Sequence, residues 1–129
     1  MIIDGKLITE LVDVASKSPR LRANYCLHQS QEDKVQRMVN VLLVGTKVPI
    51  HRHLNSAETL FVCKGKLAVI LYSDDIVEEK RVVLSNIENF AIDIPSGKWH
   101  TVEITEEVAL LEVKEGPYRP LLPNEIIEL

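Results

Sequence analysis

From Val35 onward, short runs of β-branched and aliphatic residues alternate with turn residues, and this pattern constrains the fold more than any other feature of the sequence. Turn-forming groups such as Gly45, Gly65 and Pro95-Ser96-Gly97 separate the runs. No helical period intervenes, so the pattern predicts a sandwich or barrel of antiparallel sheet. Eight strands are expected, at Arg37–Val44, Val48–His53, Glu58–Cys63, Lys66–Tyr72, Val77–Leu84, Phe90–Ile94, Trp99–Thr105 and Val108–Lys114.

The first residues follow a helical period instead. Apolar residues from Leu7 to Ala15 recur at helical spacing, Asp4 is available as an N-cap, and Pro19 blocks continuation. This predicts one short amphipathic helix over Asp4–Ser16 whose apolar stripe packs on the sheet structure.

The next segment, Ser18–His28, has neither period and is rich in polar residues. We interpret it as an irregular connection. The chain is therefore expected to consist of an N-terminal helix and irregular extension over residues 1–35, packed on a barrel over residues 36–129.

Length and charge exclude several classes of protein. A chain of 129 residues is expected to form a single compact domain. Fifteen Lys and Arg residues face nineteen Asp and Glu residues, giving a net charge of −4, which disfavours binding to nucleic acid or to an anionic membrane. No run approaches the roughly 18 apolar residues that span a bilayer, and no signal-peptide pattern opens the sequence. Cys26 and Cys63 form no Cys-x-x-Cys pair, so we expect reduced thiols and a cytoplasmic protein.

Three of the four histidines occur where neighbouring strands would bring them together. His51 and His53 are two residues apart on a predicted strand, so their side chains leave the same face. Glu58 opens the next strand, and His100 follows a turn. A His-x-His pair alone is more typical of surface histidines, but three imidazoles and one carboxylate suit a first-row divalent metal. Four protein ligands of an octahedral ion leave two positions for water or substrate.

The spacing of these residues resembles the first motif of the cupin superfamily, Gly-x5-His-x-His-x3-4-Glu-x6-Gly. Its fixed positions are occupied by Gly45, His51, His53, Glu58 and Gly65. The second motif, Gly-x5-Pro-x-Gly-x2-His-x3-Asn, is met at three positions and changed at two. Pro95, Gly97 and His100 match it, Asn89 replaces its first glycine, and Ile104 replaces its last asparagine. The resemblance implies a mainly β fold, the cupin double-stranded β-helix (jelly-roll) barrel, with a metal held by His51, His53, Glu58 and His100.

A narrower resemblance, to the WbuC-type cupin metalloproteins, covers nearly the whole chain. It implies a barrel with an N-terminal extension, a homodimer, and an association with bacterial gene clusters for surface polysaccharide, and it names no reaction. The segments that carry it are Ser18–Asn24 with His28, Val35–Arg37, His51–His53, Ile94–His100 and Glu112–Tyr118.

The polar residues Arg20, Arg22, Asn24 and His28 are the candidates for substrate contacts. Planar guanidinium groups suit carboxylates and phosphates, and an imidazole can move a proton near neutral pH. The alternative is a solvated loop. Two functions therefore stay open. One is a metal-dependent enzyme, of isomerase or dioxygenase type, acting on a polar or sugar-related small molecule. The other is a non-catalytic metalloprotein that binds a small ligand as a sensor or accessory factor in surface-polysaccharide metabolism.

Further expectations concern the metal, the cavity and the oligomer. The ion is one of Zn, Fe, Mn or Ni, and it should begin to dissociate near about pH 6 as ordinary histidines protonate. Phe61, Tyr72 and Phe90 are candidates to line the cavity or to pack in the core, whereas Trp99 alternates with His100 and should face away from the metal. Arg37–Val44, taken as an edge strand, favours a homodimer.

Overall fold

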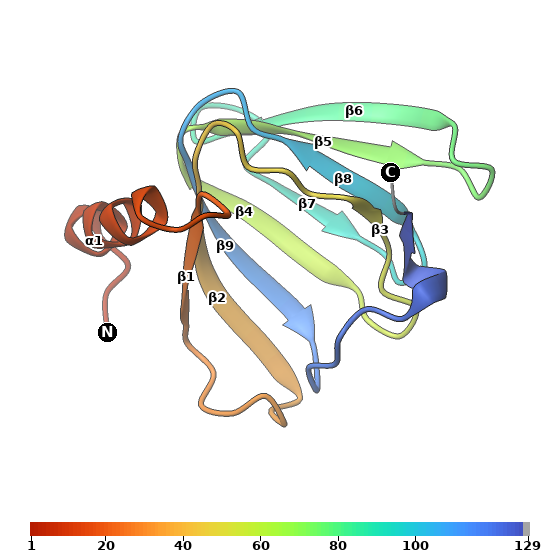
Figure 1. Ribbon diagram of the computed structural model, residues 1–129, viewed down its shortest axis with the longest axis horizontal. Coiled ribbons are helices and arrows are strands. Elements are labelled where there is room, and N and C mark those ends of the chain that lie inside the picture. Colours follow the sequence, from red (N-terminus) through yellow and green to blue (C-terminus); the bar gives the residue numbers. More distant parts are fainter. Residues whose placement is uncertain (128–129) are drawn as a thin grey trace.

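The computed structural model of the protein describes residues 1–127 and consists of two five-stranded antiparallel sheets (Figure 1). The first sheet has the order β1-β2-β9-β4-β7, and the second has the order β10-β3-β8-β5-β6. The predicted all-antiparallel architecture is therefore confirmed. The strands are β1 (Arg22–Cys26), β2 (Val35–Leu42), β3 (Ile50–His51), β4 (Glu58–Lys64), β5 (Lys66–Tyr72), β6 (Glu78–Ser85), β7 (Ala91–Ile94), β8 (Trp99–Glu103), β9 (Val108–Glu115) and β10 (Ile126–Ile127), and a 3-10 turn, η1 (Pro123–Glu125), precedes β10.

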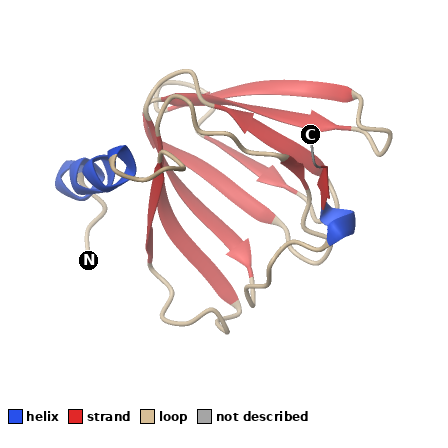
Figure 2. Ribbon diagram, viewed as in Figure 1, coloured by secondary structure: helices blue, strands red, loops and turns tan. Residues whose placement is uncertain are grey.

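The predicted N-terminal helix is α1 (Gly5–Ser16). Its N-cap is Asp4, whose side chain accepts a hydrogen bond of 3.0 Å from the Leu7 amide. Its buried residues pack on the outer face of β1 and β2, where Val39 and Val41 belong to the same cluster (Figure 2). Within residues 1–127, no helix combines the length and the apolar character needed to cross a bilayer.

Part of the segment expected to be irregular is a strand. β1 pairs with β2 along its whole length, from Arg22 opposite Leu42 to Cys26 opposite Met38. β1 lies at the edge of its sheet and is only partly covered by α1. Its residues therefore do not alternate between apolar and polar, which is why the sequence did not indicate a strand there. The same pairing corrects the expected edge position of Arg37–Val44, because β2 lies between β1 and β9.

The strand that carries the histidines is shorter than expected. A strand was predicted over Val48–His53, but only Ile50–His51 (β3) forms one. It pairs with β8 on one side and with β10 on the other. Strand β10 has two residues and was not predicted, because so short a run carries no recognisable period.

The aliphatic core lies between the sheets at the end close to α1. Figure 1 shows the two sheets meeting near α1 and diverging away from it. Buried residues from both sheets form this core, and three of them, Leu42, Leu60 and Leu110, extend it to the polar side chains of the other end. The core residues are Leu42, Leu60, Val62, Leu67, Val69, Leu84, Ile94, Val108 and Leu110.

Candidate metal centre

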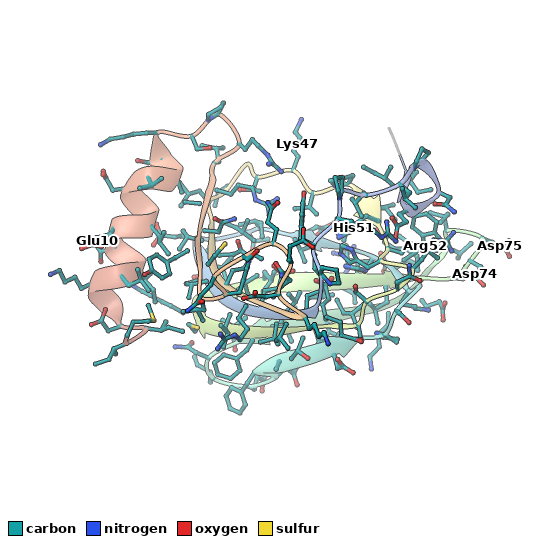
Figure 3. All side chains as sticks on the ribbon, turned by 90° about the horizontal axis from the view of Figure 1, so that it is seen from below. Glu10, Lys47, His51, Arg52, Asp74 and Asp75 are labelled. Carbon is teal, nitrogen blue, oxygen red and sulfur yellow. The ribbon has the colours of Figure 1, made fainter. Side chains whose placement is uncertain are left out.

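Four metal-ligating side chains converge at the wide end of the barrel. His51 lies on β3 directly opposite His100 on β8, His53 follows β3, and Glu58 opens β4 on the other sheet. One donor atom from each of the four lies within 4.8 Å of the others. Glu58 and His100 are buried, whereas His51 and His53 are half-buried. The cluster therefore spans both sheets, at the end of the molecule away from α1 (Figure 3 labels His51).

Backbone carbonyls orient two of the imidazole rings. His51 Nδ1 lies 2.9 Å from the Pro49 carbonyl oxygen, and His100 Nδ1 lies 2.8 Å from the Lys98 carbonyl oxygen. Because a carbonyl only accepts, each Nδ1 carries the proton and donates it. In this orientation Nε2 is the ring atom left to bind an ion, which is the arrangement typical of a metal-ligating histidine.

Burial lowers the pKa of two of the histidines, His51 and His53. It is the main cause that lowers the pKa of His51 to about 4, and the neighbouring His100 lowers it further. Burial also lowers the pKa of His53, against the opposing effect of Glu58. Protons therefore compete less well for these rings than for ordinary histidines, so the expected onset of metal loss near pH 6 moves to more acidic conditions.

The carboxylate of Glu58 is held among the histidines. Its Oε1 lies 2.7 Å from His100 Nε2 and 3.8 Å from His53 Nε2. Burial alone would raise the pKa of Glu58, but hydrogen bonds with His100 and Glu112 outweigh burial and hold the pKa well below its usual range. Glu58 is therefore an anion that accepts hydrogen bonds from His100 Nε2 and from the Glu112 carboxyl.

The donor set fits a divalent transition ion. Bonds from such an ion to nitrogen or oxygen are about 2.0–2.2 Å long, so two ligands of one ion lie at most about 4.4 Å apart. The observed spread of 4.8 Å needs shifts of only a few tenths of an ångström. Three imidazoles and one carboxylate suit Zn, Fe, Mn or Ni. The cluster can hold a metal, and its four donors leave coordination positions open.

A cavity of about 80 Å³ adjoins the cluster inside the barrel. Its walls combine ligands, aliphatic residues and polar groups. They are Arg22, Asn40, Leu42, Val48, His51, Glu58, Leu60, His100, Val102, Leu110 and Glu112.

Two polar residues of this cavity were not identified from the sequence. Glu112 accepts a hydrogen bond of 2.9 Å from Asn40 Nδ2 and is hydrogen-bonded to Glu58. Burial, followed by the contact with Glu58, raises the pKa of Glu112, so this carboxyl keeps the proton that the two glutamates share. Because side chains alternate along a strand, Glu112 shares the inward face of β9 with Leu110, and this register was the available signal.

The structure separates the candidate substrate residues. Arg22 lines the cavity, whereas Arg20 is exposed ahead of β1. Asn24 is exposed on β1 opposite Asn40. His28 follows β1, and its Nδ1 lies 3.0 Å from the Arg37 amide and 2.9 Å from the Arg37 carbonyl oxygen, away from the cavity. Only Arg22 is brought to the metal cluster.

The aromatic residues do not form the cavity wall. Phe61 and Phe90 are 43% and 52% exposed on the outside of the barrel, and Tyr72 borders a groove on the outer surface. None of the three lines the cavity beside the histidines. Trp99 faces away from the metal as expected and is buried under the guanidinium of Arg52, which lies 4.3 Å from its ring centroid.

The turn of the second motif has the backbone conformation that its residues allow. Gly97 has a φ of +82° and its amide donates a hydrogen bond of 2.8 Å to the His53 carbonyl, which joins the turn to the ligand segment. Asn89, at the position of the motif's first glycine, has a φ of +47°, a conformation that asparagine tolerates. Ile104, at the position of the last asparagine, packs against the core.

A second buried glutamate, Glu125, is hydrogen-bonded to the segment that carries His51 and His53. Glu125 is 1% exposed, and its carboxylate accepts hydrogen bonds of 2.6 and 2.9 Å from Arg119 and of 2.8 Å from each of the amides of Leu54 and Leu122. Its backbone carbonyl accepts a hydrogen bond from the Arg52 amide. We call Arg119, Glu125 and these two amides the C-terminal clasp. No sequence pattern pointed to it, because a single Arg and a single Glu are common on surfaces.

The family of the chain follows from a match to a family model. The model described as "Domain of unknown function (DUF6016)" matches residues 3–84. The chain belongs to this family. No curated protein sequence matches it.

Solved structures show which fold this DUF6016 protein has. A cupin superfamily protein from Desulfitobacterium hafniense is 15% identical, with 73% of this chain and 76% of that chain covered at a TM-score of 0.59. The protein TT1209 from Thermus thermophilus is 22% identical, with 88% and 95% covered at a TM-score of 0.63. The capsular polysaccharide assembling protein CapF from Staphylococcus aureus is 20% identical, with 76% of this chain but only 28% of CapF covered at a TM-score of 0.61. The fold is the cupin jelly roll, as the sequence motifs predicted.

Proposed function

We propose that this protein is a divalent-metal-binding cupin of the WbuC type that acts as an enzyme on a small polar or sugar-related molecule. The observation that carries the proposal is the convergence of His51, His53, Glu58 and His100 beside a cavity. Structural metal sites are closed, usually with cysteine among the ligands, whereas this cluster has no sulfur donor and opens onto space for a ligand.

The subfamily and the biological setting are part of the same proposal. Two of the segments on which the WbuC resemblance rests contribute a cavity residue each, Arg22 and Glu112. A shared role of these segments in the cavity supports the assignment to the WbuC type. CapF, a structural neighbour, is named for the assembly of capsular polysaccharide. We therefore assign this protein to surface-polysaccharide metabolism.

The residues of the site have separate tasks. The carbonyls of Pro49 and Lys98 fix the rings of His51 and His100, so the histidines need little reorganisation to bind an ion. Glu112 holds a proton beside Glu58 and the cavity, where it can donate a hydrogen bond to a bound molecule. A bound ion supplies Lewis-acid activation of a carbonyl or hydroxyl group, and Fe, Mn or Ni adds redox chemistry.

We also infer a homodimer in the cytoplasm. β1 is an edge strand whose Tyr25 is 44% exposed, and such edges are commonly covered by a partner. Both Cys26 and Cys63 are free thiols, as suits a reducing compartment. Light scattering on the purified protein should give twice the 14.6 kDa mass of the chain, and a monomer mass at micromolar concentration would contradict the dimer.

Metal analysis tests the central claim. Protein purified without added metal is expected to contain about one transition ion per chain, and His100→Ala and Glu58→Gln are expected to lose it. His28→Ala is the matched control, because it removes the one histidine outside the cluster and should leave the metal content unchanged. Wild type that binds none of Zn²⁺, Fe²⁺, Mn²⁺ or Ni²⁺ in titrations would refute the proposal. An ion bound without turnover of any small-molecule panel would favour the alternative, a ligand-binding sensor or accessory factor.

A further inference from the structure

Arg22 is the one charged side chain of the cavity that is neither a metal ligand nor bonded to one. It is the first residue of β1, where pairing with Leu42 fixes its backbone. It is half-buried, and it shares the cavity with His51, Glu58 and His100. Its position therefore comes from the sheet rather than from a mobile loop, as a residue that recognises a ligand requires.

Within residues 1–127, the guanidinium of Arg22 has no protein partner: neither an ion pair nor a side-chain hydrogen bond joins it to another residue. The arginines at 52, 81 and 119 all donate to carbonyl or carboxylate oxygens, and the other two that lack a guanidinium partner among residues 1–127, Arg20 and Arg37, are exposed. Glu112 also lines the cavity and attracts Arg22 electrostatically, but its hydrogen bonds go to Asn40 and Glu58. Because a half-buried guanidinium has five N–H donors and no acceptor, Arg22 is suited to an oxyanion that enters the cavity.

The charges of the loaded site favour an anion. A divalent ion and Arg22 bring three positive charges, whereas Glu58 and Glu112 bring at most two negative charges even when both are ionised. The site therefore keeps at least one positive charge in excess, in surroundings where charge interactions are stronger than in water. A monoanion neutralises that excess, and a neutral sugar does not.

The size and the walls of the cavity restrict the rest of the ligand. About 80 Å³ is the space of two to three water molecules, at roughly 30 Å³ each. Five of the eleven lining residues are aliphatic, which disfavours a purely polar ion such as phosphate. These are Leu42, Val48, Leu60, Val102 and Leu110.

We propose that the cavity binds a short aliphatic carboxylic acid, with Arg22 holding the carboxylate and the aliphatic walls holding its carbon chain. This inference rests on the proposed function, since it requires the metal-loaded site. It narrows the ligand class to acids of about two to four carbons, or to the acidic end of a larger molecule that projects from the cavity. Arg22 is a binding residue in this assignment, and Arg20 and His28 have no part in it.

Calorimetric titration of the zinc-loaded protein tests the assignment. Propionate and lactate are expected to bind, whereas propionamide, which has the shape of propionate without its charge, and inorganic phosphate should bind at least about tenfold more weakly. Arg22→Met should weaken propionate binding by about tenfold or more while retaining one zinc ion. Arg20→Met is the matched control and should stay within about twofold of wild type, because this arginine is exposed outside the cavity.

The outcomes separate the two proposals. Wild type that holds no metal overturns the proposed function. Wild type that holds zinc but binds propionamide or phosphate as tightly as propionate overturns the carboxylate assignment alone, as does Arg22→Met that binds propionate like wild type. If Arg22→Met does not fold, Arg22→Lys takes its place. It keeps the charge but loses the planar fork, so propionate binding should weaken by several fold, and unchanged binding would again overturn the role of Arg22.

Discussion

Glu58 and Glu125 are both buried carboxylates with lowered pKa values, but different kinds of partner stabilise them. In the C-terminal clasp, every partner of Glu125 is a donor, and Arg119 supplies the compensating charge; this hydrogen bonding with Arg119 lowers the pKa of Glu125 to about 2. In the metal centre, the partners of Glu58 are His100, His53 and the Glu112 carboxyl, of which the two histidines can themselves ligate an ion. A carboxylate surrounded by fixed donors is structural, whereas one surrounded by other metal-ligating groups marks a cation site.

The largest expected effect is a loss of metal affinity in a variant that keeps the stability of the fold. Glu58→Gln should lower zinc affinity by more than about 100-fold, since removal even of a group that only supports a ligand costs 10 to 100-fold. Stability without metal should change by less than about 1 kcal/mol, because glutamine can bond to the neighbouring imidazole and carboxyl groups. Competition with a chromophoric chelator and urea unfolding measure the two quantities. A zinc affinity within threefold of wild type would contradict the assignment of Glu58.

The same substitution in the C-terminal clasp should have the reverse effects, a large loss of stability and a small loss of metal affinity. Glu125→Gln places an amide NH₂ against donors only, so we expect a loss of about 2 kcal/mol in the free energy of unfolding. Zinc affinity should fall by less than about tenfold, because none of the four ligands is removed. Urea unfolding of the metal-free protein measures the stability loss. Equal stability of this variant and Glu58→Gln would remove the contrast between the two glutamates.

The pH dependence of stability sharpens the comparison. Since the pKa of His51 is about 4 in the native protein and about 6.5 when unfolded, the unfolded state binds an extra proton between these values. His51 therefore lowers the stability of the metal-free protein as pH falls from 6.5 to 4. Glu112 has a raised pKa, so above its ordinary pKa of 4.5 it lowers the stability as the pH rises.

The variant His51→Gln separates these contributions. The free energy of unfolding of wild type minus that of His51→Gln should rise from pH 4.5 to 6.5 and be constant above it. Urea titrations at four pH values check this. A difference that does not vary with pH would show that His51 titrates as an ordinary histidine.

The smallest effect concerns the link between the two regions. Arg52 donates from Nε to the Asn124 carbonyl at 3.0 Å and covers Trp99, so it joins the ligand strand to the C-terminal segment. Arg52→Ala should cost about 1 kcal/mol of stability. Zinc affinity should fall only a few fold. A thermal scan with and without zinc provides both numbers, and a loss as large as that of Glu125→Gln would make Arg52 part of the clasp.

The sequence predicted the fold and the metal cluster well because both depend on strong local patterns. β5 has the predicted bounds of Lys66–Tyr72, and the four ligands sit at motif positions that a turn and a strand period fix. β1 was missed because an edge strand half covered by a helix has no clean alternation. Glu112 could have been found from its register with Leu110 on one strand face, whereas Glu125 was missed because its burial depends on distant partners that no local pattern reveals.

The ligands come from both sheets, with Glu58 on one and His51 and His100 on the other. The aliphatic core ties the sheets together only near α1, so an ion held by these residues is a cross-link at the opposite, splayed end. An ion bound there would add a link between the two sheets at the end farthest from the helix, with only small shifts of the four side chains.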